Sequence, residues 1–532
     1  MSAATETDVL VIGAGLSGAV VTRRLAEAGI AVTCLEQGRR WAPEDYRGPH
    51  DDWELAAMGP WHPSPNVRRL PEDYPIDDHQ SEMKPLLFNG VGGSTILYGA
   101  FWMRMLPSDF RVRSLDGVAD DWPISYEELA PFYDRVDADF GASGIAGDPA
   151  YPARPEYPMP PLPIGTWGEK VAAAHHRLGW HWWPGSNAIA SRPYRGRRPC
   201  VQRSTCGMGC SEGAKASVDR THWPDAEKLG ARLIAGARVA RVTVGQDGLA
   251  DGAIYRLRNG SEHRIKARAV VMAASAIGTP RLLLMSADGG LSNASGLVGK
   301  RLMMHPFTRA VGLFEEPLGS TQGHWGQSLY SMELAETDAS RGFVRGAKWN
   351  LTPSGGPLSA ALFPWPDGPQ WGERLHARVA NWLGRAAIWG ISCEDLPEER
   401  NAVALDHGQT DSDGNPAVRL SYRLSQNSKA MLAYNLERVI WSLEAAGAKQ
   451  VVSRPFMGDY GWHPLGTCRM GDDPATSVVD RWGRSHDIAN LFIADGSILV
   501  TGSSVNPSAT IAALALRTAE HIVETHGAPG AA

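Results

Sequence analysis

The hydrophobic pattern of the chain begins with a largely apolar run at residues 8–12, followed by a glycine-rich turn and an amphipathic stretch at 19–28. A second apolar run at 31–35 ends on Glu36. Apolar runs of this kind are typical of strands that are buried on both faces of a parallel sheet. The order of strand, turn, helix, strand and acid predicts a βαβ dinucleotide-binding unit. Its G-x-G-x-x-G positions are occupied by Gly13, Gly15 and Gly18.

Each part of this unit has a physical role toward a dinucleotide. The glycines allow a tight turn and bring backbone N–H groups close to a pyrophosphate, whose charge is stabilised by the N-terminus of the helix expected from Ala19. Glu36 can accept hydrogen bonds from ribose hydroxyls and repels a 2′-phosphate. The alternative is a glycine-rich turn in an α/β protein without a nucleotide, and the complete order of elements argues against it.

The rest of the chain alternates between helical and strand-like segments. Residues 37–85 are rich in Pro, Trp and charge without periodicity, which predicts a long surface excursion that serves as a lid or an interface arm. Ser125 and Glu128 form a capping-box pattern before a helix to Asp139. Further strands are expected at 232–244, 264–274, 386–393, 401–406 and 417–422, with a turn at Asp413-Gly414, and further helices at 282–286 and 427–446.

This alternation predicts an α/β protein, α+β overall, with two discontinuous domains. A chain of 532 residues is too long for one compact core. We expect a Rossmann-like dinucleotide domain from residues 1–124, 200–306 and 455–532. The inserted substrate-binding domain, built on a mostly antiparallel sheet, is expected from residues 125–199 and 307–454.

Composition narrows the classes of function. The net charge is −6 and 21% of the residues are charged, so nucleic acid and membranes are not expected as partners. No apolar run approaches the ~20 residues that span a bilayer. The first strand starts at Asp8, which leaves no room for a secretory signal, and no twin arginine precedes it. We therefore expect a cytoplasmic protein.

Two polar residues that precede prolines are chemically the most informative. His463 comes before Pro464 and Asn506 before Pro507. Proline excludes the preceding residue from helical backbone angles, so both side chains have a restricted direction. Oxidation of an alcohol needs a base with a pKa near neutrality, and histidine is the natural one. The alternatives are a loop histidine with a structural role and an asparagine that caps a helix whose first residue is Pro507.

Several motifs in a fixed order resemble the glucose–methanol–choline family of FAD-dependent oxidoreductases, nearly end to end. They are the fingerprint with Glu36, the loop GVGGS at 90–94, the segment SAIGTPRLLLMS at 275–286, and a C-terminal block. That block runs from His463 through Asp495-Gly496 to Asn506-Pro507. The third motif departs from the family pattern at Ala287, where glycine is usual.

The resemblance implies a role for each motif. His463 would be the base, and Asn506 would hydrogen-bond the substrate oxygen. A helix N-terminus at the flavin pyrimidine edge would stabilise the negative charge that hydride transfer places there. The implied FAD contacts are Gly13, Gly15, Leu16, Ser17 and Gly18 at the pyrophosphate, Glu36 at the ribose, Gly92, Gly93, Ser94 and Thr95 along the isoalloxazine ring, Val239 at the adenine, Asp495 and Gly496 at the ribityl–phosphate portion, Pro507, Ser508 and Thr510 at the pyrimidine edge, and Ala274.

The resemblance also suggests a substrate. Segments 106–110 and 122–129 look most like bacterial sugar and glycoside oxidoreductases of the family. We therefore expect oxidation of a sugar or glycoside hydroxyl to a ketone, at C3 of a pyranose, with O2, a quinone or a redox protein as electron acceptor. The alternatives are an apolar alcohol such as a sterol or long-chain alcohol, which the aromatic stretch 101–103 also suits, a redox-silent lyase of the same family, and a flavin-binding subunit without catalysis.

Three further motifs bear on the same resemblance. Ile96 follows Thr95 where pyranose oxidases have a histidine that bonds the flavin covalently, so non-covalent FAD is expected. The sequence Thr221-His222-Trp223 echoes that histidine motif at the wrong place in the chain and is discounted. His305, which precedes Pro306, is expected to be structural.

The six cysteines do not indicate a disulfide scaffold. Cys200, Cys206 and Cys210 resemble the iron–sulfur ligand spacing of membrane-linked sugar dehydrogenases, but Ser211 follows where proline is common. The alternative is a set of buried thiols, and we expect no bound metal. Cys34 and Cys468 are expected to be packing residues.

Overall fold

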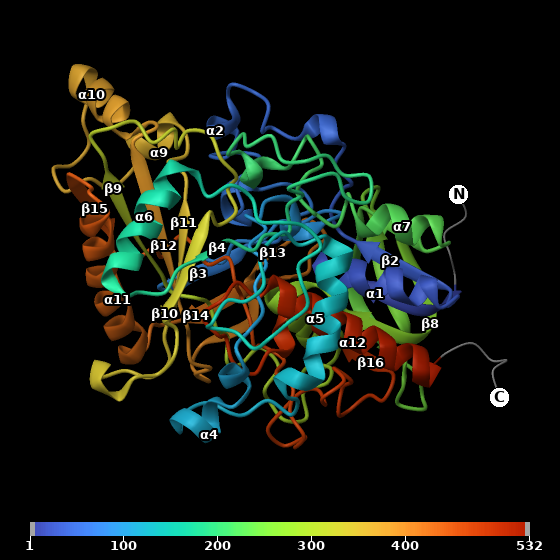
Figure 1. The fold of residues 1–532 in the computed structure, drawn as a ribbon. Coiled ribbons are helices and arrows are strands. Elements are labelled where there is room, and N and C mark those ends of the chain that lie inside the picture. The colour runs from blue at the N-terminus through green and yellow to red at the C-terminus, as the bar shows by residue number, and fades with distance from the viewer. Residues whose placement is uncertain (1–5, 527–532) are drawn as a thin grey trace.

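The computed structural model describes residues 6–526, and its largest sheet contains the predicted N-terminal βαβ unit (Figure 1). Its spatial order is β5 (Arg232–Ala235), β2 (Val32–Glu36), β1 (Glu6–Ile12), β8 (Glu262–Met272), β7 (Ala250–Leu257) and β6 (Ala237–Val244), with β16 (Leu491–Ile493) also paired to β8. β1, β2, β5, β8 and β16 pair in parallel, and β6 and β7 add an antiparallel extension. Segments far apart in the sequence share this sheet, and the mixed α/β fold is confirmed.

Three long helices pack together beside the nucleotide unit. They are α1 (Leu16–Glu27), α5 (Tyr126–Phe140) and α12 (Ser508–His526), and Figure 1 shows them side by side. The predicted capping box of α5 is confirmed. The Ser125 hydroxyl accepts from the Glu128 N–H at 3.3 Å, and the Glu128 carboxylate accepts from the Ser125 N–H at 2.8 Å. A cap of this type stabilises a helix start by about 1 kcal/mol.

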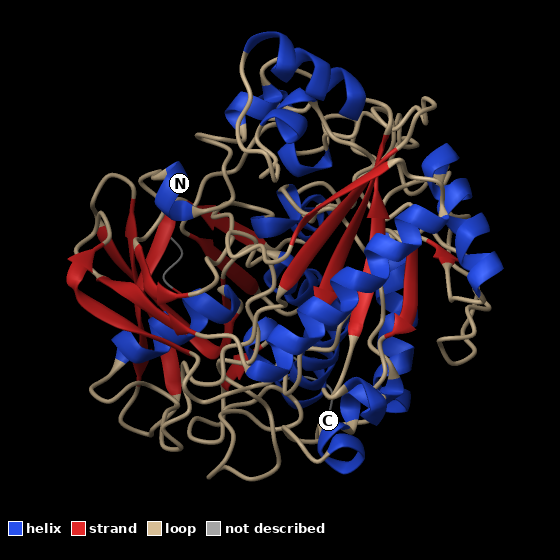
Figure 2. Cartoon of the chain, turned by 90° about the vertical axis from the view of Figure 1, so that its left-hand side faces the viewer, coloured by secondary structure: helices blue, strands red, loops and turns tan. Residues whose placement is uncertain are grey.

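The second large sheet is antiparallel, as predicted for the substrate side. Its order is β15 (Gln450–Arg454), β9 (Phe307–Leu313), β12 (Ala386–Cys393), β11 (Ala347–Thr352), β10 (Leu329–Leu334) and β4 (Trp183–Pro184). α11 (Gln426–Ala445) and α6 (Gly165–Leu178) cover one face, on which Trp349 and Trp389 are fully buried. Figure 2 shows helices lying across its long strands. The opposite face is turned toward the interior cavity described below.

Smaller elements complete the fold. β13 (Ala402–Thr410) and β14 (Pro416–Tyr422) form a hairpin, and β3 (Ile76–Ser81) joins it in parallel. The remaining helices are α2 (Trp53–Ala56), α3 (Pro65–Arg68), α4 (Val112–Asp116), α7 (His222–Lys228), α8 (Ser275–Ser286), α9 (Pro357–Ala361) and α10 (Gly372–Trp382). Single 3₁₀ turns lie at Pro43–Asp45, Gly93–Ile96, Pro107–Phe110, Cys206–Met208, Ala339–Arg341 and Gly496–Ile498.

Two predicted elements were wrong in extent. The run 232–244 is two strands, because Gly236 has a φ of 72° and turns the chain so that β5 and β6 join different neighbours. The helix expected at 282–286 is α8, which begins seven residues earlier. Pro280 lies inside it and lacks an N–H. The Ala276 carbonyl that this N–H would have bonded accepts the Thr467 hydroxyl instead, at 2.8 Å.

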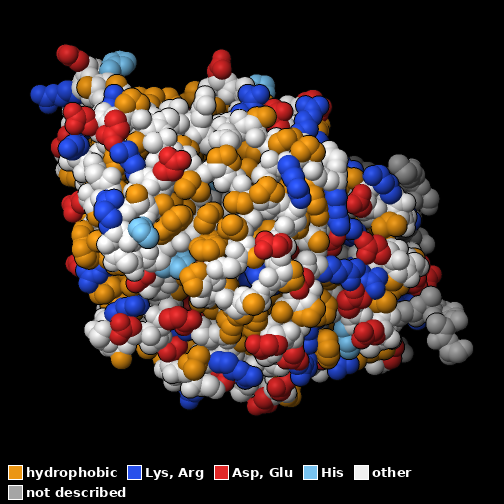
Figure 3. All heavy atoms as spheres, viewed as in Figure 1, with side chains coloured by type: hydrophobic (Ala, Val, Ile, Leu, Met, Phe, Trp, Pro, Cys, Tyr) orange, Lys and Arg blue, Asp and Glu red, His pale blue; other side chains and the backbone are white. Residues whose placement is uncertain are grey.

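The surface carries charges of both signs. Figure 3 shows positive and negative side chains intermixed on the face drawn there, without a field of one sign. Within residues 6–526, no helix is both long enough and apolar enough to cross a bilayer.

Candidate active site

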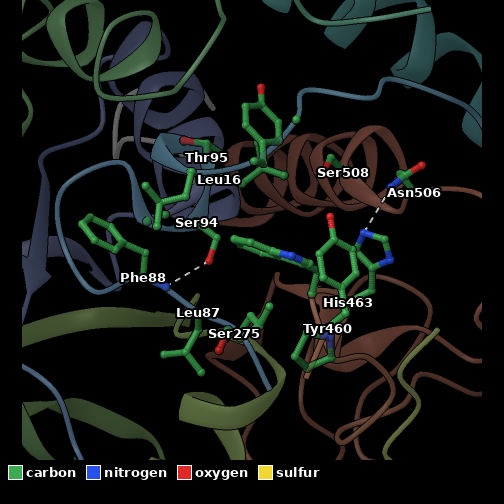
Figure 4. A pocket seen from close by; sticks show the side chains of 18 of the residues that line it. Leu16, Leu87, Phe88, Ser94, Thr95, Ser275, Tyr460, His463, Asn506 and Ser508 are labelled. Carbon is green, nitrogen blue, oxygen red and sulfur yellow. Dashed lines mark hydrogen bonds between the residues drawn. The ribbon is translucent and has the colours of Figure 1, made fainter. Parts of the chain in front are cut away.

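One cavity of about 620 Å³ is lined by residues from both large sheets and collects most of the predicted site residues. The two predicted catalytic residues, His463 and Asn506, lie in its wall (Figure 4). The predicted cofactor residues in the wall are Gly13, Gly15, Leu16, Ser17, Glu36, Gly93, Ser94, Thr95, Val239, Ala274, Asp495, Gly496, Pro507 and Ser508. Gly18, Gly92 and Thr510 do not line the cavity.

The three glycines of the fingerprint have different surroundings. A Cβ on Gly13 would lie 2.4 Å from the Ala273 carbonyl oxygen, and one on Gly18 would lie 1.9 Å from the Gly13 carbonyl oxygen. These two glycines are therefore required by the packing of the protein itself. A Cβ on Gly15 would meet only the Cα of Gly93, at 4.0 Å, and would otherwise point into the cavity. The absence of a side chain on Gly15 thus leaves the cavity open beside its backbone, which indicates that a ligand approaches that backbone.

Glu36, the acidic residue of the fingerprint, is held in place by backbone N–H groups. At the end of β2, its carboxylate accepts from the Ala14 N–H at 2.9 Å and from the Gly38 N–H at 2.8 Å. Burial raises the pKa of Glu36 to about 7, although these two N–H groups oppose the shift. The carboxylate lies in the cavity wall beside the glycine turn. It is placed to accept further hydrogen bonds from a ribose.

The loop at 92–95 is tied down by its own side chains. The Gly92 N–H bonds the Ala14 carbonyl at 3.0 Å, which joins this loop to the fingerprint turn. The Thr95 hydroxyl donates to the Gly92 carbonyl at 2.6 Å and accepts from the Val218 N–H at 3.1 Å. Ser94 accepts from the Phe88 N–H at 3.2 Å (Figure 4). Trp223, from the discounted motif, donates its indole N–H to the Ala14 carbonyl at 2.9 Å.

The C-terminal block brings a second helix start to the cavity. α12 begins at Ser508, so Pro507 precedes the helix and is not its first residue as predicted. Thr510 turns away from the cavity and bonds the Tyr133 hydroxyl at 2.7 Å. Asp495 accepts from the N–H groups of Ser497 and Ser275, and burial raises its pKa. The starts of α1 and α12 therefore both lie in the cavity wall, and helix N-termini favour anionic ligand groups.

His463 and Asn506 face each other in the wall. The Asn506 Nδ2 lies 3.2 Å from the His463 Nε2, and the dashed line in Figure 4 marks this contact. The predicted capping role of Asn506 is not what its side chain does, because its Oδ1 accepts from the Lys348 Nζ at 2.7 Å. The backbone at Asn506 is held by a buried network in which Ser503 donates to Asp109 at 2.6 Å and Asp109 pairs with Arg345.

His305 contacts the predicted base directly, a role that the sequence did not reveal. The antiparallel bridge between Met303 and Leu465 places His305 opposite His463. Their Nδ1 atoms are 2.9 Å apart, and their rings are T-shaped with centroids 4.8 Å apart. The other nitrogen of His305, Nε2, lies 3.1 Å from the Gly502 carbonyl. Both histidines precede a proline, and this shared pattern was the available signal.

Lys348 is the second residue that sequence reasoning missed. It lies on β11 and is fully buried, and its Nζ donates to Gln327 Oε1 at 3.0 Å and to Asn506 Oδ1 at 2.7 Å. Among residues 6–526, no carboxylate pairs with it. Burial lowers the pKa of Lys348 to about 7. Because the Lys348 amine donates to Asn506 Oδ1, the NH2 group is the end of the Asn506 amide that faces His463.

These contacts indicate which nitrogen of each histidine carries the proton. Gly502 offers only a carbonyl, so His305 donates to it from Nε2 and accepts at Nδ1. The Asn506 NH2 group donates to His463 Nε2, so neutral His463 carries its proton on Nδ1, which faces His305 Nδ1. Its Nε2 holds a lone pair that faces Asn506 and the cavity. Burial, His305 and Lys348 together lower the pKa of His463 well below its ordinary value. The site thus presents a neutral imidazole with its basic nitrogen toward a bound ligand.

The state of His463 leads to an expected pH dependence. A neutral base loses activity only when pH falls to its own pKa, and that pKa lies below the ordinary value of 6.5. We expect the acid limb of kcat/KM for the FAD-loaded protein to lie below pH 6.5. A pH–rate profile from pH 5 to 9 measures it, and an acid limb at or above pH 6.5 would contradict the assignment.

Replacing Lys348 by Met should lower kcat. The Asn506 amide would lose the partner that orients it, and we expect a loss of about 10- to 100-fold, the range of a charged hydrogen bond. KM should change less, and Gln at this position, which can still donate to Asn506, should restore part of the rate. Steady-state kinetics on flavin-loaded variants test this. If the Met variant keeps kcat within twofold of the wild-type value, Lys348 does not contribute to catalysis.

The three clustered cysteines, Cys200, Cys206 and Cys210, are partly buried in a segment beside the cavity loop. No three or more His, Cys, Asp or Glu side chains of residues 6–526 are arranged to hold an ion. Cys200, Cys206 and Cys210 are free, and burial raises the pKa of Cys200 to about 12. Lys215 Nζ donates to the backbone carbonyls of Ile96, Tyr98 and Cys206, which ties this segment to the cavity loop.

Comparison with known proteins identifies the family. The N-terminal model of the GMC oxidoreductases matches residues 7–307, and their C-terminal model matches residues 397–515. The chain belongs to the GMC oxidoreductase family. This oxidoreductase is 42% identical to the 2-methyl-1,2-propanediol dehydrogenase of Mycolicibacterium austroafricanum, over 98% of its own length and 96% of the relative's. It is 30% identical to the fructose dehydrogenase large subunit of Gluconobacter japonicus, over 97% and 98% of the two chains.

The fold of this GMC oxidoreductase is shared with a solved relative. A formate oxidase of Aspergillus oryzae, studied for modification of its FAD, matches with a TM-score of 0.64 at 17% identity, over 98% of this chain and 99% of its own. The family and its named dehydrogenases show that the protein is an oxidoreductase that acts on alcohol donors.

The residues of this oxidoreductase fit the FAD that GMC oxidoreductases use. Gly15 leaves room for a pyrophosphate, Glu36 is in place for a ribose, and the starts of α1 and α12 lie in the cavity wall. Ser94 and Ser508 lie in the wall between the glycine turn and the catalytic pair (Figure 4). FAD, when bound, supplies an acceptor for hydride at its N5 atom.

Proposed function

We propose that this GMC oxidoreductase oxidises a hydroxyl group of a sugar or related polyol to a ketone, with FAD as the hydride acceptor and His463 as the base. The observation that carries the proposal is the contact between His463 Nε2 and Asn506 Nδ2 in the wall of the cavity that also contains Gly15. At a pyranose, we expect the reacting hydroxyl to be the one on C3.

The neutral imidazole defines the proton path. A substrate hydroxyl that enters between the two side chains donates to His463 Nε2 while its oxygen accepts from Asn506 Nδ2. His463 then takes the hydroxyl proton as hydride leaves the carbinol carbon. His305 keeps a lowered pKa of about 4 because of burial, so it stays neutral and continues to accept from His463 Nδ1. The positive charge therefore remains on His463.

We further propose that FAD is held without a covalent bond and that O2, a quinone or a redox protein reoxidises it. Ile96 is fully buried at the position where a covalent histidine would stand. In the described part of the chain, His463 is the only histidine of the cavity wall, and no cysteine lies there. Denaturation with trichloroacetic acid should therefore release the flavin into the supernatant.

Anaerobic mixing with a panel of alcohols tests the proposed function. We expect sugars or polyols to bleach the flavin absorbance and to yield one ketone per flavin. Bleaching by sterols or long-chain alcohols alone would reassign the substrate to an apolar alcohol. Turnover of a cyanohydrin without bleaching would indicate a lyase. The absence of any reaction with all these compounds would indicate a flavin-binding subunit without catalysis.

A further inference from the structure

The register of the antiparallel sheet divides the substrate side of the cavity into rows. Side chains directly opposite on neighbouring strands point to the same face, and the next row on that face lies about 6.7 Å farther along. The first row is Lys348, Ser392 and Phe307. Lys348 holds Asn506, Ser392 Oγ lies 3.0 Å from His305 Nδ1, and the Phe307 ring lies 5.6 Å from that of His463. This row supports the catalytic pair.

The second row contains polar side chains that have no role in the proposed reaction. It runs across four strands as Asn350, Gly390, Arg309 and Arg454, and all four residues line the cavity. Arg309 and Arg454 are direct cross-strand neighbours, and like charges in this position repel. Arg454 is neutralised by Asp459, with N and O 2.8 Å apart. Arg309 has no such partner within residues 6–526.

The polar groups of this row are unpaired where they face the cavity. The buried Nε of Arg309 has no hydrogen-bond partner, and neither its Nη atoms nor the Asn350 amide bonds any other described residue. Gly390 lies between them, and a Cβ there would come within 3.0 Å of the Asn350 Nδ2. The Arg309 guanidinium lies over the Tyr460 ring, 5.6 Å from its centroid, which holds it on the cavity side. The Nη donors of Arg309 and the Asn350 amide thus lie on either side of Gly390 in the cavity wall, where a larger residue would crowd Asn350.

We propose that Asn350, Gly390 and Arg309 form a subsite for an anionic oxygen group of the substrate, a carboxylate or a phosphate. Arginine binds both anions through two parallel hydrogen bonds, and an unpaired guanidinium in a partly buried wall is stabilised by such a partner. The row spacing places this group about 6.7 Å from the row that supports the base. The preferred substrate is then an alcohol that carries its anion several bonds away from the reacting hydroxyl. This inference rests on the proposed function.

Three sugars that share the same C3 hydroxyl provide the test: D-glucose, D-glucuronate and D-glucose 6-phosphate. Anaerobic flavin reduction gives kcat/KM for each with the FAD-loaded wild type, the Arg309→Met and Arg309→Lys variants, and an Arg378→Met control. Arg378 pairs with Asp367 and does not line the cavity. A separate titration records the change in the flavin spectrum that each sugar causes on binding, whether or not it is oxidised.

We expect at least one anionic sugar to exceed glucose by roughly 10-fold or more in kcat/KM, the effect of one charged hydrogen bond. Arg309→Met should remove that preference and change glucose less than threefold, Arg309→Lys should keep part of it, and Arg378→Met should change nothing. If glucuronate shows this preference over glucose, the subsite binds a carboxylate. If glucose 6-phosphate shows it, the subsite binds a phosphate. Oxidation of glucose with equal or higher efficiency than both anions would overturn the subsite and leave the proposed function intact. Anion binding that depends on Arg309 without any flavin reduction would support the subsite and refute the proposed function.

Discussion

Replacing Gly15 by Leu is expected to yield a folded protein that contains no FAD and oxidises no alcohol. The backbone at Gly15 has a φ of −76°, which any residue adopts, and a side chain there would meet only Gly93 Cα at 4.0 Å before it enters the cavity. The leucine would therefore occupy the space of the pyrophosphate rather than disturb the protein. Flavin content per chain, measured by absorbance, should fall to near zero, while the circular dichroism spectrum stays that of the apoprotein.

Two other glycines serve as controls for this result. Gly59→Ala should leave flavin content and folding unchanged, because no atom lies within 4 Å of the added Cβ. Gly18→Ala should instead lower the yield of folded protein, because its Cβ would overlap the Gly13 carbonyl oxygen. A Gly15→Leu protein that binds FAD at the wild-type ratio would show that the cofactor does not approach this turn.

Replacing His463 by Ala should preserve the flavin spectrum and slow flavin reduction by about 10²- to 10⁴-fold, the usual contribution of a positioned general base. Lys348, Asn506 and His305 would remain, but none of them offers a basic nitrogen to the substrate oxygen. Lys348 donates to Asn506 Oδ1, and the Asn506 NH2 group is a donor as well. Lys348 and His305 lie outside the cavity wall, and His305 Nε2 is bonded to the Gly502 carbonyl. Stopped-flow reduction under anaerobic conditions measures the change.

The matched control is His79→Ala, which removes an exposed histidine outside the cavity and should leave the rate unchanged. His305→Ala should give an intermediate loss, because His463 would lose the acceptor that fixes its tautomer. A His463→Ala protein that reduces its flavin within threefold of the wild-type rate would exclude His463 as the base.

Local signals account for what the sequence could predict. The βαβ unit is encoded within 36 residues, and Gly13, Gly15 and Glu36 from it line the cavity. The capping box at Ser125 is likewise complete within four residues and is confirmed. Such features need no knowledge of which segments meet in the fold. His463 and Asn506 were identified as a pair only through the family resemblance, and their side chains do lie together.

The residues that were missed depend on long-range register. His305 reaches His463 only through the bridge between Met303 and Leu465, which joins segments about 160 residues apart in the chain. Lys348 stands in an alternating strand, where a polar residue is normally turned toward water. In this fold the polar face of β11 is turned toward the cavity, so Lys348 is buried against Asn506. No local pattern distinguishes these two situations.

The helix at 275–286 shows a third kind of limit. Pro280 predicts a break, because proline cannot supply the N–H that the preceding turn requires. Thr467, nearly two hundred residues away, satisfies the freed Ala276 carbonyl at 2.8 Å, so the helix continues through the proline. A distant side chain thus cancels the local signal.

The reduction of the bound flavin by an alcohol with deuterium on its carbinol carbon tests the central claim most directly. We expect wild-type protein, mixed anaerobically with a sugar that it oxidises, to bleach its flavin more slowly when that carbon carries deuterium. Hydride transfer from carbon to flavin is then part of the measured step. Product formation without bleaching, or bleaching with no isotope effect in single-turnover experiments with a saturating sugar, would contradict it.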